Sequence, residues 1–117
     1  MTCNACENAF NGVQSLVVSI TRSGGGGSTA TLFVGNHSPN VVLIERILLC
    51  AAYPGGGSTT LYLRAPPNQI AWTYPSTYLE QGITANYYTL TGLPAGTIVQ
   101  AQAEYIAFES RARSCAM

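Results

Sequence analysis

The residues from Gly96 to Phe108 alternate strictly between two sets of side chains. The first set is apolar or small and the second mixes polar and apolar types: Val99, Ala101, Ala103, Tyr105 and Ala107 against Ile98, Gln100, Gln102, Glu104 and Ile106. A period of two is typical of a strand with one covered face, because successive side chains of a strand point to opposite sides of the sheet. The clearest signal in the chain therefore predicts strands rather than helices.

The same period recurs earlier in the chain. Leu16, Val18 and Ile20 take every second position within Val13–Ile20, and alternate residues of Thr29–Val34 are apolar. Further strands are expected over the following ranges: Ser58–Arg64, Ala85–Thr91, and one or two short edge strands between residues 68 and 82.

Glycine and proline divide these segments, at Gly24–Gly27, Pro54–Gly57 and Gly92–Gly96. Such residues set the backbone of turns and interrupt regular structure. About seven short strands at intervals of roughly 8 to 12 residues, with turns between them, predict an all-β fold. We expect an antiparallel β-sandwich, immunoglobulin-like or jelly roll, of about seven to eight strands over residues 13–117.

The segment Val41–Cys50 allows two interpretations. Ser38 followed by Pro39 is a pattern that begins helices, whereas the β-branched run from Val41 to Ile44 favours a strand. As a strand it is apolar on both faces except at Glu45 and Arg46. We therefore expect a central strand that is covered on both faces, or one that is covered by another copy of the protein.

Charge is scarce in this chain. Only 9% of the 117 residues are charged, the formal net charge is zero, and neither lysine nor aspartate occurs. A nucleic-acid-binding surface needs many clustered cations, so no specific nucleic acid is expected. No apolar run is long enough to span a membrane.

Catalytic motifs are missing as well. Without aspartate or lysine the chain lacks a Ser-His-Asp triad, a P-loop and a Schiff-base lysine. The single histidine, His37, lies among turn-forming residues, where a histidine in a solvated loop is expected rather than a catalytic one. The tripeptide from Asn36 matches the N-glycosylation pattern, but such tripeptides often occur by chance. We expect no enzymatic activity, no catalytic residue and no cofactor.

Four cysteines occur: Cys3, Cys6, Cys50 and Cys115. Their even number in a small domain favours disulfides, with one bridge between the N-terminal segment and Cys115. A four-thiolate zinc site and free buried thiols are the alternatives, and three disulfide pairings are open.

Two resemblances accompany these patterns. Residues 88–97, Tyr-Thr-Leu-Thr-Gly-Leu-Pro-Ala-Gly-Thr, resemble the end of strand E, the corner and the start of strand F in fibronectin type III domains. Residues 31–44, together with the low charge and abundant Thr, Tyr and Gly, resemble the β-domains of archaeal pilins and archaellins. The first resemblance implies a β-sandwich, and the second implies a filament subunit.

The low charge predicts burial against neighbouring copies, because a monomer relies on charged side chains to remain separate. We expect a structural subunit of a repetitive assembly, most directly a minor capsid or decoration protein of a virion. Residues 1–12 are expected to form an N-terminal arm without a secretion signal, and virus particles can assemble inside the cell without export. A filament subunit outside the cell is one alternative, and a carbohydrate-binding module that uses the aromatic residues is another. The expected interface residues combine the apolar segment and the aromatic region: Val41, Leu43, Ile47, Leu49, Trp72, Tyr74 and Tyr78.

Overall fold

The computed structural model describes residues 16–107 and 110–116 of the chain. Eight strands and one short 3-10 helix occupy them: β1 (Leu16–Ser23), η1 (Gly25–Gly27), β2 (Thr29–Asn36), β3 (Val42–Ala52), β4 (Ser58–Leu63), β5 (Tyr78–Leu79), β6 (Thr84–Leu90), β7 (Ile98–Ala107) and β8 (Ser110–Ala116). In these residues no helix is long and apolar enough to cross a membrane.

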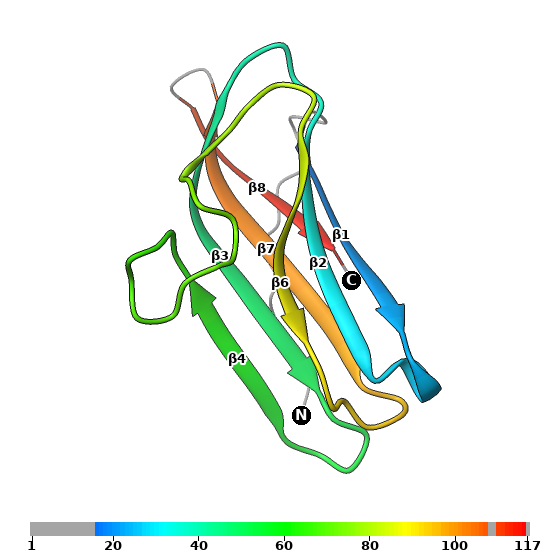
Figure 1. The fold of residues 1–117 in the computed structure, drawn as a ribbon. Coiled ribbons are helices and arrows are strands. Elements are labelled where there is room, and N and C mark those ends of the chain that lie inside the picture. The colour runs from blue at the N-terminus through cyan, green and yellow to red at the C-terminus, as the bar shows by residue number, and fades with distance from the viewer. Residues whose placement is uncertain (1–15, 108–109, 117) are drawn as a thin grey trace.

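The strands form two antiparallel sheets that pack face to face (Figure 1). The first sheet has the order β1-β2-β6, and the second has the order β4-β3-β7-β8, with β5 paired to one end of β3. The predicted all-β sandwich is confirmed. In chain order, β1, β2 and β6 take the places of strands A, B and E of an immunoglobulin-like sandwich, and β3, β7 and β8 take those of C, F and G.

The core lies between the two sheets and follows the alternation in the sequence. In β1, Leu16 and Val18 are buried, and Ile20 packs against the core. In β7 all five residues of the apolar or small set, from Val99 to Ala107, are buried. Strand β1 lies beside β8, where Ser114 Oγ donates a hydrogen bond to the Leu16 carbonyl at 3.0 Å and so links the two sheets.

The Gly24–Gly27 run forms the hairpin loop between β1 and β2, as predicted. Gly24, Gly26 and Gly27 all have positive φ angles, which residues with a Cβ rarely adopt. Arg22 holds the loop from the side, since its Nε donates to the Gly27 carbonyl at 3.0 Å and its Nη1 donates to the Thr97 carbonyl at 2.6 Å. The loop is thereby tied to the corner before β7.

Strand β3 settles the two interpretations of Val41–Cys50 in favour of a strand, and it contains a β-bulge. Ile44 pairs with Tyr105 and Arg46 with Glu104, so Glu45 is the extra residue. A bulge places two residues of one strand opposite one residue of its partner. Before it Val42 and Ile44 face the core, and after it Ile47, Leu49 and Ala51 do.

One strand was not predicted. Strand β8 pairs with β7 along its whole length and completes the edge of the second sheet. Its inward residues, Ala112, Ser114 and Ala116, are buried.

Candidate interaction surface

The outward face of the β4-β3-β7-β8 sheet carries the groups that could meet a partner. At one end of this face, Leu43 lies between Tyr78 of β5 and Ile106 of β7 in a single row across three strands. Tyr78 is 56% exposed, and Leu43 and Ile106 are half-buried. Val41, directly before β3, is 51% exposed. We call Val41, Leu43, Tyr78 and Ile106 the apolar end patch.

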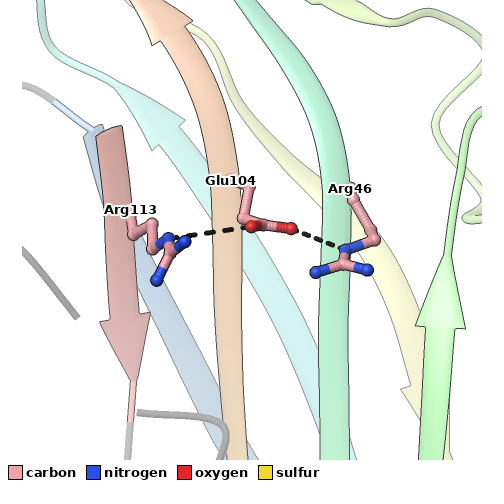
Figure 2. A network of polar contacts seen from close by, with 3 residues as sticks. All are labelled: Arg46, Glu104 and Arg113. Carbon is pink, nitrogen blue, oxygen red and sulfur yellow. Dashed lines mark hydrogen bonds and ion pairs between the residues drawn. The ribbon is translucent and has the colours of Figure 1, made fainter. Parts of the chain in front are cut away.

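A row of charged side chains crosses the middle of the same face (Figure 2). Arg46 Nε donates to Glu104 Oε2 at 2.5 Å, and Arg113 Nε lies 3.7 Å from Glu104 Oε1 on the other side. The Arg46 guanidinium also lies 5.4 Å from the ring centroid of Tyr62, a cation–π distance. The Glu104 carboxylate therefore lies between two guanidinium groups, and the three charged side chains of the row sum to +1.

Five of the seven predicted interface residues separate into two groups, and the other two, Trp72 and Tyr74, lie in the aromatic cluster described next. Val41, Leu43 and Tyr78 lie in the apolar end patch. Ile47 and Leu49 are 0% and 2% exposed and pack inside the sandwich. One apolar face of this segment forms the core of the chain itself. A neighbouring copy therefore cannot contact Ile47 or Leu49 in the folded protein.

The aromatic residues of the proline-rich region lie mostly inside the sandwich. Trp72 is 1% exposed and meets the edge of the Tyr87 ring at a centroid distance of 5.4 Å, while half-buried Tyr74 stacks on Tyr87 at 5.2 Å. Trp72 Nε1 donates to the Ser76 carbonyl at 3.2 Å. Burial, with Tyr74 nearby, raises the pKa of the Tyr87 phenol far above its usual range. This cluster fills the core and presents no flat aromatic platform.

Both cysteines in the described part of the chain are in disulfides: Cys50 in β3 and Cys115 in β8. Cys50 is 3% exposed, and its Sγ accepts a hydrogen bond from Thr60 Oγ1 at 3.8 Å on the outward face. Cys3 and Cys6 lie outside the described residues, as does the predicted arm of residues 1–12. Within residues 16–107 and 110–116, no three His, Cys, Asp or Glu side chains are grouped to hold a metal ion.

The turn after β2 is a closed polar unit rather than an acceptor site. Asn36 is fully buried, and its Nδ2 donates to the Asn40 and Leu79 carbonyls at 2.7 and 2.8 Å. Its Oδ1 accepts from the Ser38 backbone N–H at 2.9 Å. The amide is thus committed to holding the turn, whereas His37 is exposed.

Sequence reasoning missed the charged row and Ile106. Glu104 and Arg46 are adjacent only through the pairing of β7 with β3, and Arg113 requires the unpredicted strand β8. Opposite charges on two strands predict an ion pair when they lie directly across from each other, but this requires the register of the strands to be known first. No protein family, curated protein or solved structure matches the chain, so both resemblances stay predictions.

Proposed function

We propose that this chain is a non-enzymatic structural subunit that assembles with copies of itself through the apolar end patch. The observation that carries the proposal is the row Tyr78-Leu43-Ile106, which places three apolar side chains side by side on an outward sheet face. Tyrosine is among the residues most enriched at the centres of protein interfaces. Its ring supplies a large contact area, and its hydroxyl can find a polar partner.

The charge of the chain supports the same proposal. A net charge of zero and a charged fraction of 9% leave little electrostatic repulsion between copies. The charged groups that do lie on this face neutralise one another in part, because Glu104 is placed between Arg46 and Arg113. A second copy can therefore approach the face without burying a large unbalanced charge.

The finer proposal is a minor capsid or decoration protein on the outside of a virion. The oxidised state of Cys50 and Cys115 supports an exposed location, since disulfides persist at virion and cell surfaces and are rare in reducing compartments. A subunit of an extracellular filament is the alternative of the same class. The carbohydrate-binding alternative is weakened by the burial of Trp72 and Tyr87, which removes two rings from any stacking platform.

The test compares one charge substitution on each outward face. Tyr78→Glu places a carboxylate in the apolar end patch, and Val17→Glu places one at a 45% exposed apolar site on the other sheet. If the patch is the interface, Tyr78→Glu weakens self-association about 30-fold or more, because a buried unpaired charge costs at least about 2 kcal/mol. Val17→Glu leaves association unchanged.

Light scattering over a concentration series, followed by electron microscopy of the large species, gives the readout. Rings, shells or filaments that disappear with Tyr78→Glu alone support the proposal. A wild-type monomer at every concentration contradicts it, and so does an equal effect of the two substitutions. Circular dichroism of both variants confirms that loss of assembly is not loss of fold.

A further inference from the structure

The surface that the apolar end patch contacts decides how far an assembly can grow. If the patch of one copy contacted the same patch of a second copy, the two copies would close into a dimer with two-fold symmetry. A contact between two different surfaces continues from copy to copy into a ring or a filament. A repetitive assembly through this patch therefore needs a second surface of the chain, away from the patch.

Three loops meet at the end of the sandwich opposite the patch (Figure 1). A Cβ atom on Gly26 would lie 3.1 Å from Ala95 Cβ, so the loop after β1 lies against the loop before β7. A Cβ atom on Gly96 would lie 3.5 Å from Pro54 Cβ, so that loop also lies against the turn after β3. Beside them Ile98, the first residue of β7, is 60% exposed. We call residues 24–27, 54–57, 92–96 and Ile98 the loop end, and none of these residues is charged.

Two exposed glycines of the loop end, Gly25 and Gly55, are not required by the fold of the chain itself. Neither has a positive φ angle, and a Cβ atom on either would have no other atom within 4 Å. Glycine at such a position lowers stability, because it increases the conformational entropy of the unfolded chain. A second molecule that packs directly on the backbone gives a reason for the missing side chains.

We propose that the apolar end patch of one copy packs on the loop end of the next copy, so that copies join head to tail. This inference rests on the proposed function, because it names the surface that the patch contacts. Strand β7 begins at Ile98 in the loop end and reaches Ile106 in the patch near its other end. The two surfaces therefore lie at opposite ends of the same strand, and the contact repeats along the strand direction.

The chemistry of the two surfaces is matched. Neither the patch nor the loop end contains a charged residue, so their contact buries no unpaired charge. The bare backbone at Gly25 and Gly55 leaves room for a large ring such as that of Tyr78. A tyrosine ring supplies apolar contact area, and its hydroxyl can donate to a backbone carbonyl.

Mixing two variants of the full chain tests the head-to-tail contact. Tyr78→Glu disables the patch and keeps the loop end, whereas Ile98→Glu disables the loop end and keeps the patch. Each variant alone is expected to self-associate at least about tenfold more weakly than the wild type, because a carboxylate would be buried without a partner. An equimolar mixture is expected to form a 1:1 dimer that grows no further, since it joins one intact patch to one intact loop end. Analytical ultracentrifugation measures both results, and Val17→Glu on the other sheet is the control that assembles as the wild type does.

Gly55→Asp is a second loop-end variant and is expected to behave as Ile98→Glu does, because a Cβ atom at this site has open space around it. If both loop-end variants assemble like the wild type while Tyr78→Glu does not, the head-to-tail contact is overturned and the proposed function stands. A mixture that stays monomeric, although each variant alone has lost assembly, also overturns the contact. A wild type that is monomeric at every concentration contradicts both proposals.

Discussion

The two sheets share one core but have very different outward faces. The face of β1-β2-β6 carries mainly hydroxyl and amide groups, from Ser19, Thr21, Ser23, Thr29, Thr31, Thr84, Asn86 and Thr89. Val17 and half-buried Phe33 are the large apolar residues of this face. The face of β4-β3-β7-β8 carries the charged row, the apolar end patch and both described cysteines. The difference shows that two sheets with a common core can present very different side chains: neutral polar groups on one face, and charged groups, cysteines and exposed apolar groups on the other.

Reduction of the disulfides is expected to have the largest effect and to act on one sheet. Each bridge stabilises a small domain by about 2 to 4 kcal/mol, so the free energy of unfolding and the melting temperature both fall. Differential scanning calorimetry with and without reductant measures the loss. Amide hydrogen exchange is expected to accelerate more in β3 and β8 than in β1 and β2. Equal acceleration in both sheets would remove the contrast between them.

The second prediction concerns the tyrosine hydroxyl groups that the two sheets bury in the core. Tyr105 of β7 has its hydroxyl 3.4 Å from Ser114 Oγ, whereas the buried Tyr87 hydroxyl of β6 has no hydrogen-bond partner in the described part of the chain. Because burial raises the pKa of folded Tyr87, only the unfolded phenol ionises as the pH passes 10, and stability falls with rising pH. At pH 11 the loss attributable to Tyr87 is about 1.4 kcal/mol.

Denaturant titrations of the wild type and Tyr87→Phe at pH 8 and pH 11 measure this effect. The phenylalanine variant lacks the ionisable group, so the difference between the two proteins should appear at pH 11 and not at pH 8. An identical pH dependence in both proteins would show that the Tyr87 phenol ionises as easily folded as unfolded.

The smallest effect is expected from the charged row. Glu104→Gln leaves Arg46 and Arg113 without their shared carboxylate, and we expect a cost of about 0.5 to 1 kcal/mol, limited because the side chains are partly exposed. The cost should shrink in 1 M salt, where the Debye length is about 3 Å. On the other sheet, Thr21→Val should stay within about 0.5 kcal/mol of the wild type. A salt-independent loss for Glu104→Gln would point to packing rather than charge.

The fold was predictable where apolar side chains recur at every second position over several residues, as in β1, β2 and β7. Strand β8 has the same alternation, but its inward residues Ala112, Ser114 and Ala116 are small and give little hydrophobic signal in a sequence that also contains Arg111 and Arg113. Small residues suffice there because the backbone of β1 lies close, as the hydrogen bond from Ser114 to Leu16 shows.

The candidate site was less predictable because it depends on register. The apolar segment was expected to form an interface, yet Ile47 and Leu49 belong to the core and only Val41 and Leu43 of its alternate residues join the apolar end patch. The bulge at Glu45 exchanges the faces within one strand, and no local pattern specifies which residue is the extra one. Cross-strand rows such as Tyr78-Leu43-Ile106 follow only after that register is fixed.

The bulge in β3 also decides how this strand tolerates a change of length. Glu45 is the extra residue, so a chain without it would still alternate correctly, with Ile44 and Ile47 inward and Arg46 outward. Deleting Leu48 instead would turn every later residue of β3 to the opposite face and place Cys50 in the core. The bulge between Ile44 and Ile47 is thus where β3 can lose one residue and keep the inward and outward faces of the rest of the strand.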